Sequence, residues 1–147
     1  MKNRKLTILA LTALATGVGF AGYSMALAGD DDSPLHKAME QVQAKNAFIL
    51  KNLKTPALFK KNQKEIVDSA KALSTLGKSV RDEVGPAKEM KKDQKEWTTL
   101  MDSYVKESDA FAEAVAKPDM TQAVAKDKFK AVTASCTACH TPFRKDD

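Results

Sequence analysis

Apolar residues recur every three to four positions along four stretches of the chain, the spacing that gathers them on one face of an α-helix. The first stretch follows Ser33-Pro34, a helix-capping serine and a proline suited to a first turn, and it ends before Lys54-Thr55-Pro56. The second fades at Val84-Gly85-Pro86, the third stops at Lys117-Pro118-Asp119, and the fourth opens at Thr121. The pattern therefore predicts four helices joined by short connections.

Each predicted helix carries an apolar stripe that must be buried against another helix. The apolar positions are Leu35, Met39, Val42, Phe48, Ile49 and Leu53; then Ile66, Val67, Ala70, Leu73, Leu76 and Val80; then Trp97, Met101, Tyr104, Val105, Phe111 and Val115; and finally Val124, Phe129, Val132 and Cys136. Trp97 and Tyr104, seven residues apart, share one face and are predicted to be core. No segment alternates with period two for long enough to be a strand. Mutual burial of the stripes predicts an all-α protein, an antiparallel four-helix bundle.

The N-terminal segment has the features of a signal peptide. Lys2, Arg4 and Lys5 precede an apolar run from Leu6 to about Gly17, and small residues form a cleavage pattern at Ala26-Leu27-Ala28. The run is shorter than the roughly 20 residues needed to span a bilayer. We therefore expect residues 1–28 to be a signal peptide and residues 29–147 to be the mature domain, exported to the periplasm without a membrane span.

The mature chain of 147 − 28 = 119 residues suits a single domain. Three of the 24 basic residues leave with the signal, so 21 basic and 19 acidic residues give a net charge of +2. A charge this small, spread along helical faces, gives no reason to expect nucleic acid as a partner.

A distinct chemical motif stands at the end of the fourth predicted helix, in Cys136-Thr137-Ala138-Cys139-His140. Two thiols three positions apart on a helix lie on one side, where they can add to the two vinyl groups of one haem, and the next residue supplies an imidazole for the iron. A C-x-x-C-H string in an exported chain is typical of c-type haem attachment. The sequence thus predicts one covalent haem c, held by Cys136 and Cys139, with His140 as an iron ligand.

The two cysteines have other possible uses. A redox dithiol of the thioredoxin type places its reactive thiol at a helix N-terminus, whereas this pair falls at a helix C-terminus with no βαβ pattern around it. A zinc site needs about four ligands, and outside the motif only His36 remains among the Cys and His residues. A structural disulfide is the remaining alternative.

The position of the motif, at the very C-terminus of a predicted four-helix bundle, resembles the class II cytochromes c, meaning cytochrome c′ and its low-spin relatives. The specific part of the resemblance is Cys136 to Arg144, Cys-Thr-Ala-Cys-His-Thr-Pro-Phe-Arg. It implies that Arg144 lies beside the proximal imidazole; the alternative is a surface arginine that caps the helix. Members of the family often pair into homodimers, and the sequence leaves the oligomeric state open.

The resemblance also implies that the first helix faces the distal side of the iron, where Met39 occupies the corresponding position. The alternative for Met39 is core packing, for which methionine is well suited. The family tends to have an arginine four residues earlier, where this chain has Leu35. His36 lies one turn before Met39 and is a second candidate for the sixth ligand.

Two functions fit these predictions. A six-coordinate iron suits an electron carrier that meets redox partner proteins, whereas a five-coordinate iron behind an apolar wall suits binding of a small gas such as NO or CO. We find no catalytic acid, base and nucleophile constellation, so the sequence does not predict an enzyme. Electron transfer is the function that we expect.

Overall fold

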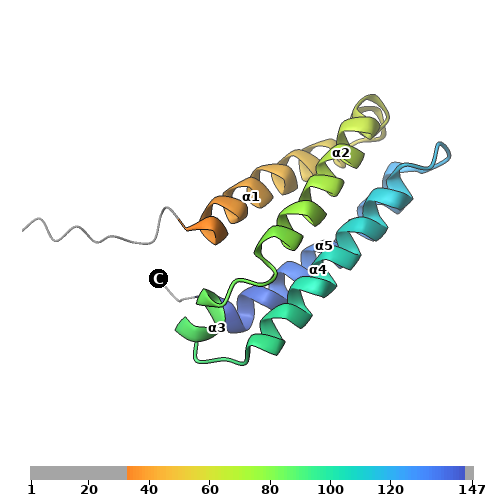
Figure 1. Ribbon diagram of the computed structural model, residues 1–147. Helices are drawn as coiled ribbons and strands as arrows, with labels where there is room; N and C mark the ends of the chain where they lie inside the picture. Colours follow the sequence, from red (N-terminus) through yellow and green to blue (C-terminus); the bar gives the residue numbers. More distant parts are fainter. Residues whose placement is uncertain (1–32, 145–147) are drawn as a thin grey trace, which may run out of the picture.

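The computed structural model describes residues 33–144, which form five helices. They are α1 (Pro34–Asn52), α2 (Pro56–Val80), α3 (Gly85–Glu89), α4 (Gln94–Val115) and α5 (Gln122–Phe143) (Figure 1). The described part of the chain contains no strand, so the prediction of an all-α protein is confirmed. The predicted signal peptide, residues 1–28, lies outside the described residues. In the range 33–144, no helix is both long and apolar enough to cross a membrane.

The four long helices begin at side chains that cap them. Ser33 accepts a hydrogen bond from the His36 amide at 3.0 Å, and Thr55, Asp93 and Thr121 cap α2, α4 and α5 in the same manner. Each such cap satisfies one amide that the first helical turn leaves without a partner. Pro34 and Pro56 follow their caps directly, where a missing N–H is tolerated. The starts predicted at Ser33 and Thr121 are confirmed.

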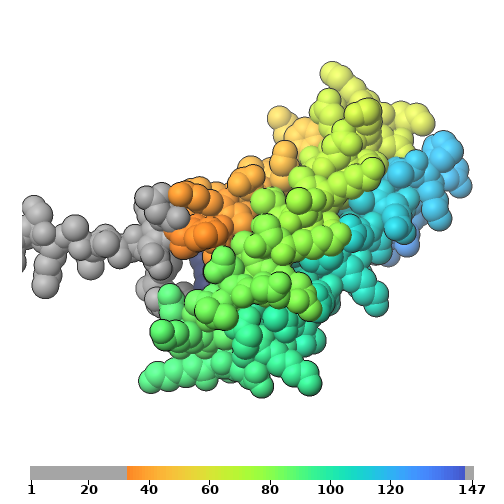
Figure 2. Space-filling view, in the orientation of Figure 1, coloured from red at the N-terminus to blue at the C-terminus, as the bar shows by residue number. Residues whose placement is uncertain are grey.

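The long helices pack against each other in the order in which they follow along the chain. α1 packs on α2, α2 on α4, and α4 on α5. α1 and α5 make few contacts with each other, and one of them is the hydrogen bond from Gln122 Nε2, at the start of α5, to the Leu53 carbonyl at the end of α1. Figure 2 shows the face on which α2 lies between α1 and α4. Contacts such as Trp97 Nε1 to the Val80 carbonyl, 3.3 Å, join the start of α4 to the end of α2, so the neighbours run antiparallel. We call the side where α1 faces α5 the seam.

The core runs the length of the four long helices. Trp97 and Tyr104 are both buried, as the periodicity predicts. The largest fully buried apolar side chains are Ile49, Leu53, Ile66, Leu73, Val80, Phe111, Val115 and Val132. Because every long helix contributes to this core, any group held inside it would contact several helices at once.

The short helix α3 was not predicted. It begins at Gly85, with Pro86 in its first turn, and packs against α4. Its one buried residue is Ala87. Five residues that bury one alanine leave no apolar stripe to recognise in a sequence.

Candidate functional site

Helix α5 carries Cys136, Cys139 and His140 in its last two turns. At 100° per residue the three side chains fall within an arc of about 100° around the helix. Cys139 is buried, with 5% of its surface exposed, Cys136 is half-buried, and His140 is exposed. Both cysteines are free thiols. The helix thus presents the whole motif on one side, with Cys139 in the core, Cys136 half-buried and His140 at the surface.

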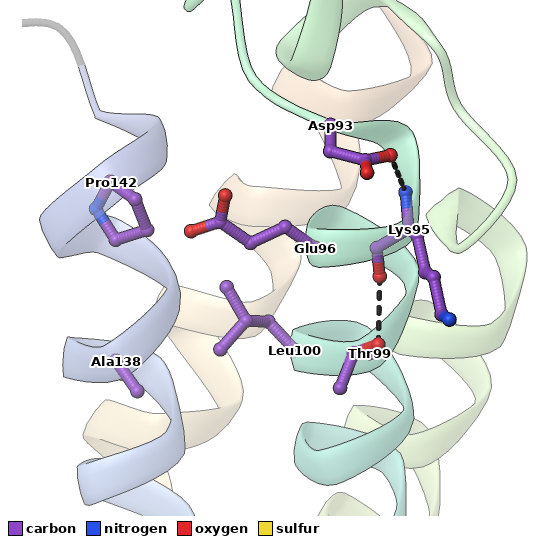
Figure 3. A pocket seen from close by; sticks show the side chains of 7 residues that line it. All are labelled: Asp93, Lys95, Glu96, Thr99, Leu100, Ala138 and Pro142. Atoms are coloured by element: carbon purple, nitrogen blue, oxygen red, sulfur yellow. Dashed lines mark hydrogen bonds between the residues drawn. The ribbon is translucent and has the colours of Figure 1, made fainter.

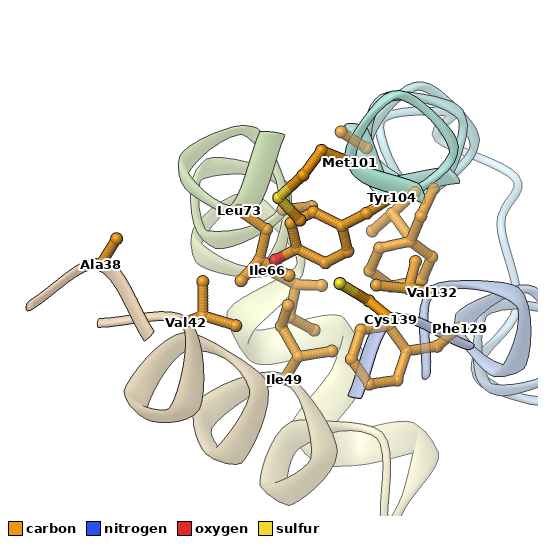
Figure 4. Close-up of a cluster of buried hydrophobic side chains, with 14 of the residues drawn as sticks. Ala38, Val42, Ile49, Ile66, Leu73, Met101, Tyr104, Phe129, Val132 and Cys139 are labelled. Carbon is orange, nitrogen blue, oxygen red and sulfur yellow. The ribbon is translucent and has the colours of Figure 1, made fainter. Parts of the chain in front are cut away.

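The Cys139 thiol points into the interior of the protein, where Tyr104, Met101 and Phe129 surround it (Figure 4). Burial raises the pKa of Cys139 to about 11, and the neighbouring Cys136 adds to this shift. Burial also raises the pKa of Cys136. Thiols with raised pKa values, at a helix C-terminus, are poor nucleophiles at neutral pH, which argues against a thioredoxin-like dithiol.

Asn46 of α1 is the residue that reaches Cys136 across the seam. The Asn46 side chain lies near enough to Cys136 to lower the pKa of that thiol, which opposes the effect of burial. The Oδ1 atom of Asn46 is buried and has no hydrogen-bond partner. Asn46 was not predicted from the sequence; its one signal is a polar residue seven positions after Met39, on the same face of the helix.

The predicted distal residues lie further along α1. Met39 is partly buried against the core, as is Leu35. Seven residues separate Met39 from Asn46, which is about 10 Å along the helix axis. Asn46 therefore lies level with Cys136, and Met39 lies nearer to the end where α5 finishes. His36 is exposed, and its Nε2 lies 3.7 Å from Glu40 Oε1.

Arg144 is positioned directly after α5. Its backbone N–H donates to the His140 carbonyl at 3.1 Å, and its side chain is exposed. The pKa of His140 is lowered, first by partial desolvation and then by the charge of Arg144. Both effects favour the neutral imidazole, the form that binds a metal through a ring nitrogen.

A haem-sized group inserted at the seam would meet side chains of several kinds. The two thiols face it from α5, and Val42 and Ile49 point from α1 into the interior (Figure 4). Asn46 Oδ1 is a buried acceptor without a donor. The seam thus offers two thiols, an imidazole, apolar walls and an unsatisfied polar atom. Together these fit a haem inserted at this loosely packed side.

A shallow groove lies on the opposite face of α5. It is formed with the start of α4, and its lining residues are Asp93, Lys95, Glu96, Thr99, Leu100, Ala138 and Pro142 (Figure 3). Neither thiol nor the His140 imidazole lines it. This groove is therefore separate from the site at the seam.

Comparison with known proteins gives no assignment: no protein-family model, curated protein or solved structure matches this chain. Within residues 33–144, no three Cys, His, Asp or Glu residues gather as a set that could hold a metal ion.

Proposed function

We propose that this chain is an exported, single-haem c-type cytochrome that works in electron transfer, with the helices arranged as an antiparallel four-helix bundle around the haem. The observation that carries the proposal is the Cys136-x-x-Cys139-His140 motif in the last turns of α5, with two free thiols on the side where α1 does not pack closely. The predicted signal peptide would deliver the chain to the periplasm, where its partners would be redox proteins.

The two thiols would attach the haem without any change in oxidation state. Each S–H would add across one vinyl C=C bond, so that sulfur would bond to one carbon and hydrogen would go to the other. When bound, the haem supplies one-electron chemistry at its iron. The buried surroundings of Cys139 would keep water away from that attachment point, and Cys136 would hold the edge nearer the surface.

His140 is the proposed iron ligand on the attachment side. Its partial desolvation and the nearby charge of Arg144 lower the pKa of the imidazole, which keeps a ring nitrogen free to coordinate. Arg144 would thus act beside the imidazole as well as ending the helix through its backbone N–H. Met39 is the proposed sixth ligand.

The experiment is to express the precursor in an export-competent host that attaches haem c, and to purify the mature protein. Its mass should exceed that of residues 29–147 by one haem, and the pigment should resist acid-acetone extraction. Cys139→Ala should retain at most one thioether, and Thr137→Ala, between the cysteines, is the matched control that should keep both. Complete extraction of pigment from the wild type would refute covalent attachment.

A second candidate function is the binding of a small gas at a five-coordinate iron. The observation that favours it is the register of α1: Asn46 lies level with Cys136, and the buried, apolar Val42 lies between Asn46 and Met39 along the helix. An apolar side chain facing the iron would leave room for NO or CO. Optical spectra of the wild type and of Met39→Ala, with and without CO, separate the two functions.

A further inference from the structure

Three hydroxyl groups in the core have no hydrogen-bond partner. They belong to Tyr104 and Ser108 of α4 and to Ser74 of α2, and the three oxygen atoms are buried without a donor or acceptor. The residues expose only 3%, 0% and 2% of their surface. A buried hydroxyl without a partner costs free energy, so one such group is unusual and three in one region need an explanation.

The register between α2 and α4, which pack against each other, brings the three residues to one region of the core. The Cβ position of Gly77 in α2 would fall 2.8 Å from Tyr104 Cδ1 and 3.0 Å from its Cε1, so one edge of the Tyr104 ring lies against Gly77. Ser108 follows Tyr104 by one turn, and Ser74 precedes Gly77 by one turn. Because α2 and α4 run antiparallel, these two steps go in the same direction and bring Ser74 opposite Ser108.

The Tyr104 hydroxyl lies close to Ser108. Ser108 lies near enough to lower the pKa of Tyr104, although neither hydroxyl makes a hydrogen bond of ordinary geometry. Burial and the nearby Cys136 outweigh that effect and raise the pKa of Tyr104. Tyr104 is therefore neutral and keeps its proton to donate, and Figure 4 shows its oxygen turned toward α2 near Leu73.

We propose that Tyr104, Ser108 and Ser74 form a binding site for an internal water molecule between α2 and α4. A buried water typically makes about three hydrogen bonds to groups that would otherwise have no partner, and three hydroxyls on facing turns supply that number.

The chemistry of the site favours water over an anion. All three groups are neutral, and none of the buried residues that the structure describes is Lys, Arg or His. A buried anion would lack a compensating charge and would lie near the thiols of the motif. Hydroxyls donate and accept equally well, which matches a water molecule.

Stability measurements give effects of opposite sign for a water site and for three unpartnered groups. We would measure the midpoint of thermal unfolding of the purified mature protein for Ser74→Ala, Ser108→Ala and Tyr104→Phe. Ser103→Ala, at an exposed position of α4, is the control for the higher helix propensity of alanine. The water site predicts that Ser74→Ala and Ser108→Ala lower the midpoint relative to this control, and that Tyr104→Phe lowers it relative to the wild type. Midpoints at or above these references would overturn the proposal, because removal of an unpartnered hydroxyl stabilises.

The Ser74→Ala, Ser108→Ala double variant tests whether the groups share one ligand. The double variant should lose less than the sum of the single losses, since the same water cannot be lost twice. A strictly additive result would overturn a shared site.

A high-resolution crystal structure of the wild type completes the test. It should show one water within hydrogen-bond distance of the three oxygens. A haem in contact with these hydroxyls would overturn the water site while supporting the proposed function, and a dry site would overturn it whatever the haem content. The site does not depend on haem, so the two proposals can fail separately.

Discussion

The rings of Trp97 and Phe143 meet edge to face, with centroids 5.4 Å apart and planes inclined at 76°. Trp97 also donates its Nε1 hydrogen to the Val80 carbonyl at 3.3 Å. One indole therefore connects the end of α2, the start of α4 and the end of α5. Phe143 lies three residues after His140, so this contact holds the final turn of the helix that carries the motif.

Phe143→Ala should lower the free energy of unfolding by about 1–3 kcal/mol, because a half-buried ring and its aromatic contact are lost. Trp97 is the one tryptophan of the chain, so its fluorescence should shift to longer wavelength as water reaches the indole. Thr141→Ala, at an exposed position two residues earlier, is the control. An unchanged stability and emission maximum would show that the ring contact does not hold the helix end.

Gly77→Ala should destabilise the protein by roughly 1–3 kcal/mol, although alanine is the better helix former. The added methyl group would lie 2.8 Å from Tyr104 Cδ1 and 2.9 Å from Val105 Cγ2, so the ring or the helix must move. Gly85→Ala, where the methyl group meets nothing within 4 Å, should cause little change. The two midpoints of thermal unfolding, compared directly, measure this effect.

The chain without haem should lose stability between pH 9 and pH 11. Burial raises the pKa of Cys139 from 9.0 to about 11, so the folded state keeps the proton while the unfolded state releases it. The stabilisation is complete below pH 9 and disappears as the pH rises through about 11, a loss on the order of 2 kcal/mol. Denaturant unfolding across this range measures it, with Cys139→Ala as the control for other groups that titrate there. In the haem-bound protein both sulfurs would be thioethers, so its pH profile should match that of the control.

Met39→Ala decides between the two candidate functions. If Met39 ligates the iron, both oxidation states of the wild type should be low-spin, and CO should bind slowly or hardly at all. The variant should then become high-spin when reduced and take up CO readily. A wild type that is already high-spin and binds CO quickly would assign Met39 to the wall and favour gas binding. A low-spin spectrum that His36→Ala abolishes would assign the sixth position to His36. Optical spectra of each oxidation state, with and without CO, give the answer.

Much of the fold could be predicted because its signals are local. Ser33 and Thr121 cap helices within three residues of themselves, and the periodic stripes extend over whole helices. The C-terminal boundary of the last helix is less regular, since α5 continues through Pro142 as far as Phe143. A proline in a last turn removes one helical hydrogen bond and crowds the carbonyl four residues earlier. The packing of Phe143 on Trp97 stabilises the residues around Pro142.

The candidate site could be predicted only in part, for a related reason. The motif is contiguous and can be recognised from the sequence alone. The approach of Asn46 to Cys136 depends on the register between α1 and α5, which no local pattern determines. The hydroxyls of Ser74 and Ser108 likewise become a pair only through the close approach of α2 and α4 at Gly77.

The loosely packed seam has a consequence for the order in which the protein assembles. Each closely packed pair of long helices is consecutive or separated only by α3, so these contacts close short loops, which favours fast folding. The contact between Asn46 and Cys136 instead closes a loop of 136 − 46 = 90 residues, with a larger entropic cost. The two ends of the chain should therefore come together last. Until they do, the thiol-bearing side of α5 stays accessible, and a cofactor fixed there would become the link that joins the first helix to the last.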